Sequence, residues 1–177
     1  MSEADRNGRT RSQTLATDTS ETTDEENAQE IRQKTALQEL FLILEENARI
    51  KNKPVNSAIH AIPIPIKTGN DISPFTLRIN PAIVSNGKLE VAVLDFYRDE
   101  TYHLQQWVIK AKWTDEGPKI TGLDASRVGD DTRHFRLTEI VEYAGSSLRK
   151  RMDEADGTNT TPNLAMSTPP GYSNRIN

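Results

Sequence analysis

The stretch from Lys88 to Trp113 constrains the fold more than any other part of the sequence. It consists of KLEVAVLDFY, a polar turn RDET, and YHLQQWVIKAKW. In the second arm successive residues alternate between two faces, and one face carries Trp107, Ile109, Ala111 and Trp113. This period of two predicts a half-buried strand, so the whole stretch predicts an antiparallel β-hairpin. Because both tryptophans of the chain lie on it, we expect the other elements to cover this face.

The first arm of the hairpin does not keep one register. Leu89, Val91 and Val93 share one face, whereas Leu94 and Phe96 fall on the opposite one. A β-bulge inserts one extra residue and returns the following side chains to the first face. We therefore expect a bulge near Leu94.

The charged residues divide the chain of 177 residues into a core and two tails. Residues 1–27 hold three arginines, seven acidic residues and almost no large apolar side chains. Residues 28–155 hold eighteen charges of each sign, and residues 156–177 hold one of each. A segment that buries little apolar surface does not offset the entropy of ordering. We therefore expect a disordered acidic tail at 1–27, a core domain at 28–155 and a disordered tail at 156–177.

Apolar residues at helical spacing predict a helix within 24–51. One face of this helix carries Leu37, Leu40, Phe41, Leu44 and Ala48. Leu42 and Ile43 lie off that stripe and widen the apolar surface. A helix that is apolar over more than one face is either deeply buried or contacts a partner, so both core packing and self-association remain open for it.

Three short strands and a second helix complete the predicted fold. The strands are an edge strand or extended arm at Ile62–Ile66, where prolines alternate with isoleucines, and short runs at 75–79 and 119–123. The second helix follows Asp131 or Thr132, and its apolar stripe runs from Leu137 to Met152. We expect an α+β fold, in which an antiparallel sheet of about five strands is covered by two helices, with disordered N- and C-terminal tails.

Residues that would carry catalysis or bind a metal do not form a recognisable motif. His60, His103 and His134 lack the spacing of metal ligands, and the chain has no cysteine. No glycine-rich phosphate loop, nucleophile elbow or paired acidic motif occurs. We therefore expect a protein that is not an enzyme and that holds no cofactor and no metal.

A short motif near the C-terminus has the form PPxY. It consists of Pro169, Pro170, Gly171 and Tyr172. WW domains recognise such segments because the prolines hold a polyproline helix and the tyrosine fills an adjacent slot. Pro169, Pro170 and Tyr172 are therefore candidate WW-domain contacts.

Basic residues of the second half of the chain are candidates for contact with phosphate groups of RNA or lipid. They are Lys110, Lys112, Arg127, Arg133, Arg136, Arg149, Lys150 and Arg151. They would form one local patch if the helix and the hairpin came together, although Glu139, Glu142, Asp153 and Glu154 dilute the charge. A solvated charged surface is the alternative.

The length, the layout and the PPxY element from Pro169 to Tyr172 together resemble the matrix proteins of rhabdoviruses, in particular the short ones of plant-infecting cytorhabdoviruses. The resemblance implies a non-enzymatic structural protein of the virion. Such a protein self-associates, contacts the nucleoprotein–RNA complex and the inner face of the membrane, and in several members recruits WW-domain proteins for budding. It also implies a location in the virion and the host cytoplasm, peripheral to the membrane.

Two features of this chain differ from that family's pattern. Its N-terminal tail is acidic where the family has a basic segment, and its PPxY element lies near the C-terminus. Two other functions therefore remain open. One is a nucleic-acid-binding viral accessory protein, such as a silencing suppressor or movement protein, and the other is a cellular adaptor that binds WW domains.

Overall fold

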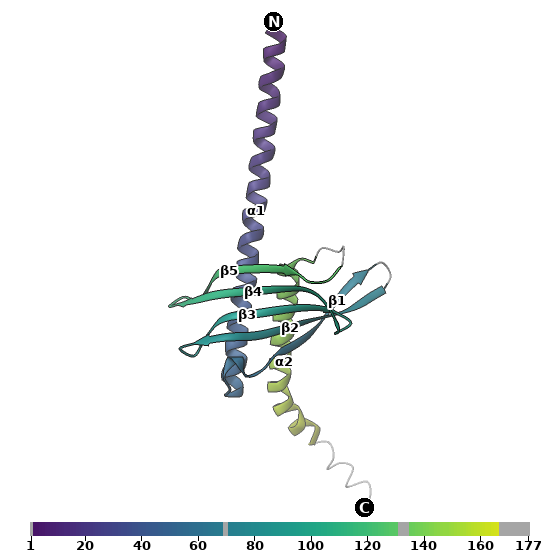
Figure 1. Cartoon of the computed structure of the whole chain (residues 1–177). Helices are drawn as coiled ribbons and strands as arrows, with labels where there is room; N and C mark the ends of the chain where they lie inside the picture. The colour runs from purple at the N-terminus through teal and green to yellow at the C-terminus, as the bar shows by residue number, and fades with distance from the viewer. Residues whose placement is uncertain (1, 69–70, 131–134, 167–177) are drawn as a thin grey trace, which may run out of the picture.

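The computed structural model describes residues 2–68, 71–130 and 135–166, with side chains described within 22–66, 74–130 and 135–155. Two long helices and a five-stranded antiparallel sheet make up the chain, which confirms the predicted α+β fold (Figure 1). The elements are α1 (Ser2–Lys51), the short 3-10 helix η1 (Val55–Ser57), β1 (His60–Thr68), β2 (Asp71–Ser85), β3 (Lys88–Arg98), β4 (Tyr102–Thr114), β5 (Gly117–Arg127) and α2 (Leu137–Met166).

The sheet is a simple meander in which each strand pairs with the next along the chain, in the order β1-β2-β3-β4-β5. Strands β3 and β4 form the predicted central hairpin, with Leu94 opposite Trp107. The prolines of Ile62–Ile66 lie in β1, which is an edge strand. Proline has no N–H to donate to a neighbouring strand, and an edge strand has a neighbour on one side only, so few hydrogen bonds are lost there.

The predicted bulge near Leu94 is wrong, because Leu94 pairs in regular register on both sides. The irregularities in β3 lie further along the strand in each direction, near Val91 against β2 and after Phe96 against β4. Ala92, Leu94 and Phe96 are buried in the core, whereas Val91 lies on the opposite face with its side chain half-buried. The first arm therefore directs aliphatic side chains to both faces of the sheet. For this reason its sequence pattern did not indicate where the bulge lies.

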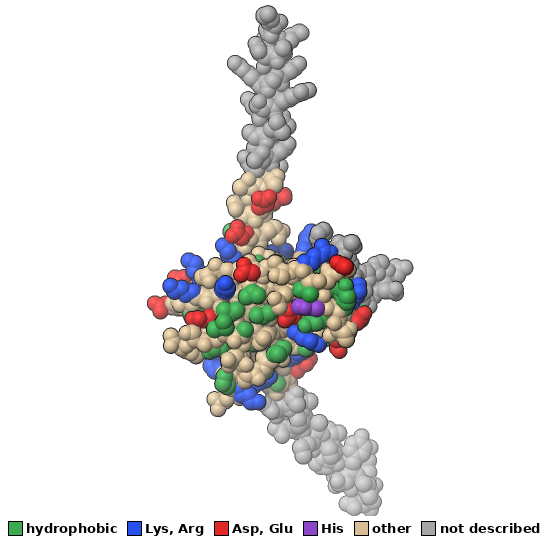
Figure 2. Space-filling view, in the orientation of Figure 1, with side chains coloured by type: hydrophobic (Ala, Val, Ile, Leu, Met, Phe, Trp, Pro, Cys, Tyr) green, Lys and Arg blue, Asp and Glu red, His purple; other side chains and the backbone are tan. Residues whose placement is uncertain are grey.

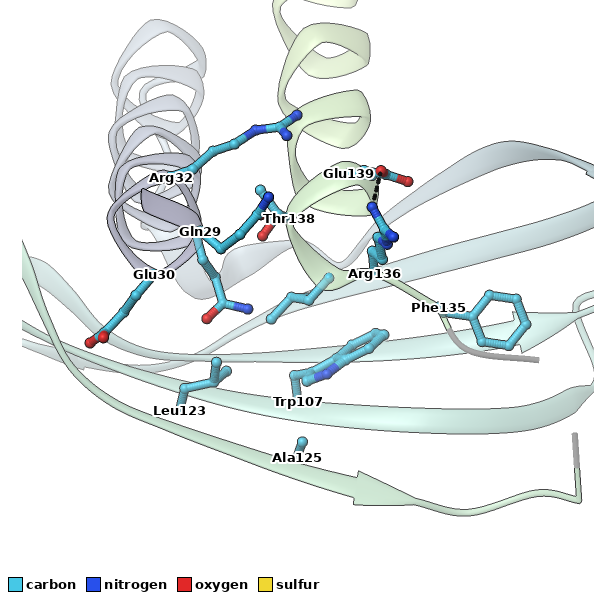
Figure 3. Close-up of a pocket in the computed structure, with 12 residues that line it drawn as sticks. Gln29, Glu30, Arg32, Trp107, Leu123, Ala125, Phe135, Arg136, Thr138 and Glu139 are labelled. Atoms are coloured by element: carbon cyan, nitrogen blue, oxygen red, sulfur yellow. Dashed lines mark ion pairs between the residues drawn. The ribbon is translucent and has the colours of Figure 1, made fainter. Parts of the chain in front are cut away.

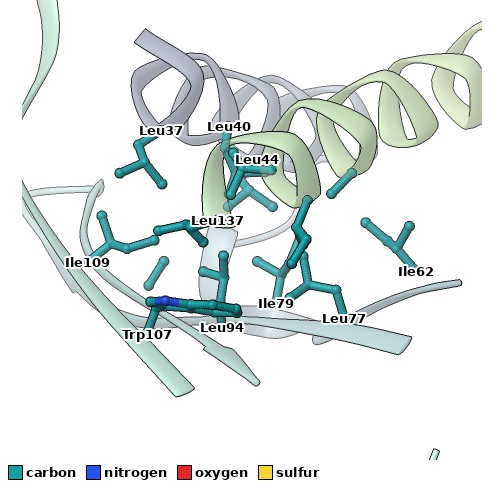
Figure 4. Close-up of a cluster of buried hydrophobic side chains, with 14 of the residues drawn as sticks. Leu37, Leu40, Leu44, Ile62, Leu77, Ile79, Leu94, Trp107, Ile109 and Leu137 are labelled. Atoms are coloured by element: carbon teal, nitrogen blue, oxygen red, sulfur yellow. The ribbon is translucent and has the colours of Figure 1, made fainter. Parts of the chain in front are cut away.

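One face of the sheet is covered by α1 and α2, and the core lies between these two layers (Figure 4). The predicted stripe of α1 is buried there, since Leu37, Leu40 and Phe41 are each at most 1% exposed. From the sheet, the Phe75 and Phe96 rings stack with their centroids 5.3 Å apart. Burying one large apolar side chain contributes about 1.5–3 kcal/mol, so this layer supplies most of the stability of the fold.

The two helices run side by side in the same direction, and ion pairs join them at two levels. Arg32 donates two hydrogen bonds to the Glu142 carboxylate, at 2.7 and 2.8 Å, and thereby lowers the pKa of Glu142. Further along, Arg149 pairs with Glu39. Gly145 lies at the contact between the helices, where an added Cβ would come within 3.3 Å of Ile43 Cδ1.

Both helices extend beyond the layer that covers the sheet. Helix α1 is longer than the helix predicted within 24–51, and its described side chains at 22–32 are all exposed. The predicted disorder of residues 1–27 stays a prediction. Helix α2 continues to Met166, whereas Pro169, Pro170 and Tyr172 lie outside the described residues.

We predict that replacing Gly145 with leucine reduces the free energy of unfolding by about 1–3 kcal/mol, because the added side chain overpacks the contact with Ile43. Urea unfolding would measure the change. Ser146→Leu, on the exposed side of the same helix turn, should stay within about 0.5 kcal/mol of the wild type. Equal effects of the two substitutions would contradict close packing at Gly145.

Candidate functional site

The face of the sheet that α1 and α2 leave uncovered carries an apolar patch. Figure 1 shows both helices passing behind the sheet, so this open face is turned toward the viewer. Ile83 on β2 is 52% exposed, and the valines of the patch are half-buried. Across the strands Ile83 is opposite Val91, and Val93 is opposite Val108, so the four side chains are neighbours. We call Ile83, Val91, Val93 and Val108 the open-face patch.

Polar and charged side chains of both signs surround the open-face patch. Lys110 on β4 is opposite Val91, and Asp124 on β5 is opposite Val108. The Lys110 Nζ lies 3.8 Å from the Asp124 carboxylate. Figure 2 shows this arrangement, with hydrophobic side chains in the middle of the face and blue and red ones around them. An apolar centre within a polar rim is the usual anatomy of a protein–protein interface.

A stack of side chains crosses three strands beside the open-face patch. The guanidinium of Arg78 on β2 lies 4.4 Å from the centre of the Tyr97 ring on β3. The His103 ring on β4 stacks on Tyr97 with the centroids 4.7 Å apart and the planes within 18°. Since β2 and β4 flank β3, Arg78 and His103 approach Tyr97 from opposite sides. Tyr97 therefore has both of its ring faces occupied.

Asp95 joins this stack through its carboxylate. Gln106 Nε2 donates a hydrogen bond to Asp95 Oδ1 at 2.9 Å, and His103 Nε2 lies 2.9 Å from the same oxygen. That histidine nitrogen is buried and, among the described residues, has no hydrogen-bond partner besides this close carboxylate contact. A proton donor or acceptor in catalysis must reach the reacting group, and His103 Nε2 faces the protein instead. The arrangement supports a structural role for this cluster.

The basic residues predicted as one phosphate-binding patch are divided between the two sides of the sheet. Lys110 and Lys112 project from the open face, because they alternate with the buried Ile109 and Ala111. Arg149, Lys150 and Arg151 belong to α2, on the covered side. The structure therefore does not bring them into a single patch.

Several of these cations also contact carboxylates or backbone. Arg136 is paired with Glu139 at 3.6 Å and Lys150 with Glu154 at 4.0 Å, while Arg149 bonds Glu39. Arg127 ends β5 with an exposed side chain, and Arg133 lies outside the described residues. Phosphate contact by these residues stays a prediction.

A second group of cations, which the sequence did not single out, gathers where α1 ends. Arg49 and Lys51 occupy the last turn of α1, and Lys53 follows directly. In the part of the chain that the structure describes, these three side chains form no ion pair. Lys88, the first residue of β3, lines one hollow together with Arg49 and Lys53. Arg151 of α2 and Lys51 both lie close enough to His60 to lower its pKa. We call Arg49, Lys51, Lys53, Lys88 and Arg151 the basic end.

A groove of about 530 Å³ lies between α1, the first turn of α2 and the last two strands (Figure 3). Its floor is apolar and includes Trp107, Leu123 and Phe135. The arginines at its rim are already engaged with carboxylates, Arg32 with Glu142 and Arg136 with Glu139. The groove therefore offers a hydrophobic surface without an uncompensated cation for an anionic ligand.

Within the described ranges, no group of three or more His, Asp or Glu side chains is placed to hold a metal ion. No helix of the described part is long and apolar enough to cross a bilayer. The chain matches no protein-family model, no curated protein and no solved structure.

The pKa of His60, at the start of β1, is affected by burial and by cations of the basic end. Burial lowers the pKa of His60, and the positive charges of Lys51 and Arg151 lower it further. The folded protein therefore binds a proton at His60 less readily than the unfolded chain does. The contribution of His60 to stability is present at neutral pH and is lost as the pH falls through about 6.5.

We predict that His60→Gln makes the free energy of unfolding less dependent on pH between about pH 7.5 and about pH 5.5. Urea unfolding of both proteins at each pH would measure this difference. Parallel losses of stability in the wild type and the variant would contradict a lowered pKa at His60.

Proposed function

We propose that the chain is a non-enzymatic structural protein of the viral matrix kind. In this proposal it self-associates and bridges a nucleoprotein–RNA complex and the envelope membrane during assembly and budding. It acts in the virion and the host cytoplasm, peripheral to the membrane. The observation that supports self-association is the open-face patch, which leaves four aliphatic side chains on an uncovered sheet face.

The charges around the open-face patch favour a protein as its partner. Arg78 and Lys110 stand on the same face as Asp95 and Asp124. A polyanion such as RNA, or an anionic membrane, is attracted by a surface of one sign and is repelled by these carboxylates. A second copy of the chain presents both signs and an apolar centre, so it can match this face.

A bridging protein also needs a second surface that is separate from its self-contact. The basic end provides a mainly cationic surface, and Arg49, Lys51 and Arg151 in it come from the helices on the covered side of the sheet. One part of the molecule can thus contact copies of the chain while another contacts anionic groups.

A nucleic-acid-binding accessory protein is the second candidate, and the cations of the basic end favour it, because the phosphates of nucleic acids bind cationic side chains. Proteins that bind single strands stack bases on exposed aromatic rings. Tyr97, however, has a side chain against each of its ring faces, so a base has no free face of Tyr97 to stack on. The WW-binding adaptor depends on Pro169, Pro170 and Tyr172, which are outside the described residues.

We predict that Ile83→Glu and Val93→Glu each weaken self-association at least about 100-fold, because a carboxylate buried without a partner costs several kcal/mol. Sedimentation velocity over a range of protein concentrations would measure the oligomers. Association of the wild type through an apolar patch should persist at high salt.

Leu42→Glu is the matched control, since it places the same charge on an exposed apolar residue of α1. It should leave self-association unchanged. If Leu42→Glu dissociates the oligomers and both open-face variants assemble normally, α1 and not the sheet is the self-contact. A wild type that stays monomeric at all concentrations would contradict the proposed function.

A further inference from the structure

The basic end is held in place by the way α1 terminates. Asn52 has a φ of 52°, in the left-handed region, and directs the chain out of the helix. The Asn52 N–H donates to the Arg49 carbonyl at 3.1 Å, and the Lys53 N–H donates to the Ala48 carbonyl at 3.0 Å. These two bonds form a Schellman motif, which satisfies the last carbonyls of a helix. The backbone that carries Arg49, Lys51 and Lys53 is therefore well defined.

Exposed aliphatic side chains lie among these cations. After α1 the chain forms η1, which is anchored by Val55, a residue only 7% exposed. On either side of this anchor Ile50 and Ile59 are 52% and 63% exposed. Two isoleucines left in water beside several cations give the basic end both an apolar and a cationic character.

Contacts from other elements complete the basic end. Arg151 reaches over from α2 and donates to the Ala61 carbonyl at 3.2 Å. Lys88 lies 4.8 Å from the centre of the Trp113 ring and lines a hollow of about 640 Å³ together with Arg49 and Lys53. Figure 2 shows blue side chains gathered at the lower end of the body, where α1 ends.

The five cations of the basic end outnumber the two acidic groups that line its hollow. Glu45 and Glu46 line the same hollow, and Glu45 accepts a hydrogen bond from the Leu89 N–H at 2.6 Å. The lowered pKa of His60 agrees with a positive potential here, since Lys51 and Arg151 contribute to it. At the opposite end of α1, residues 1–27 carry a net charge of -4, from three arginines and seven acidic residues (Figure 1).

We propose that the basic end docks on the surface of a bilayer that contains anionic lipids, with Arg49, Lys51, Lys53 and Arg151 at the headgroups and Ile50 and Ile59 in the interface. The inference rests on the proposed function, because it assigns the membrane contact of that function. Peripheral membrane sites combine cations with aliphatic groups, whereas single-stranded RNA sites combine cations with exposed aromatic rings. The exposed apolar side chains between these cations are isoleucines, which favours lipid.

The experiment is sedimentation of the full chain with phosphatidylcholine vesicles that contain or lack phosphatidylserine, at low and high salt. The test variant replaces Arg49, Lys51 and Lys53 with glutamine. Each cation near an anionic bilayer strengthens binding about fivefold, so this variant should bind phosphatidylserine vesicles roughly 100-fold more weakly. The pair Ile50→Ser and Ile59→Ser should reduce the binding that remains at high salt.

The matched control replaces Arg6, Arg9 and Arg11 with glutamine, which removes the same charge from the sequence before residue 28. It should bind phosphatidylserine vesicles nearly as well as the wild type. Equal losses in the two triple variants would overturn the proposal, since the contact would then depend on net charge alone. The proposal would also be overturned if the wild-type protein does not bind these vesicles but binds a single-stranded RNA oligonucleotide through the basic end.

Self-association is measured on the same proteins without vesicles. If the wild type binds vesicles through the basic end but stays monomeric, the proposed function fails while the membrane site stands. If it assembles but the triple variant binds vesicles as the wild type does, the membrane site fails alone.

Discussion

Burial of one face of the sheet under α1 and α2 is the interaction on which the rest of the structure depends. The meander brings Ile79, Leu94 and Trp107 side by side from three neighbouring strands, and each is at most 3% exposed. The helices add Leu40 and further apolar side chains to the same layer. A five-stranded sheet has a second face, however, and two helices that lie on one side cannot cover it. The open face follows directly from this arrangement.

The parallel course of the two helices decides where the charges lie. Arg32 meets Glu142 and Arg149 meets Glu39, so the facing surfaces of the helices neutralise one another. Within the described residues, Arg49, Lys51 and Lys53, which lie in the last turn of α1 and just beyond it, form no ion pair. The molecule thus carries an apolar patch with a mixed rim and a cationic end, and the two surfaces suit partners of different chemistry.

Much of the fold was predictable from local patterns in the sequence. The hairpin of β3 and β4 followed from the alternation around Trp107, and the stripe of α1 from the helical spacing of Leu37 and Leu40. The position of the bulge was not predictable, because Val91 and Leu94 are both aliphatic although they face opposite sides of the sheet. A pattern of two apolar faces does not show which face the helices cover.

The candidate sites depended on long-range placement and were predicted less well. Cations close in sequence were grouped with Lys110 and Lys112, but the sheet separates these lysines from α2. The basic end draws Arg49 from α1 and Arg151 from α2, residues about a hundred positions apart. Runs of charge in sequence could not indicate that the two helices run in parallel and bring these residues to one end.

The central claim is that the open-face patch is covered when the protein assembles. The chain has no cysteine, so a single Val93→Cys substitution places one thiol in the patch. The most direct measurement is the rate at which a maleimide labels this thiol in dilute and in concentrated protein, with Glu116→Cys in the β4–β5 turn as the reference. If the patch is covered, labelling at position 93 slows as oligomers form, while labelling at position 116 does not change. Equal labelling rates at position 93 in monomer and oligomer would contradict this claim.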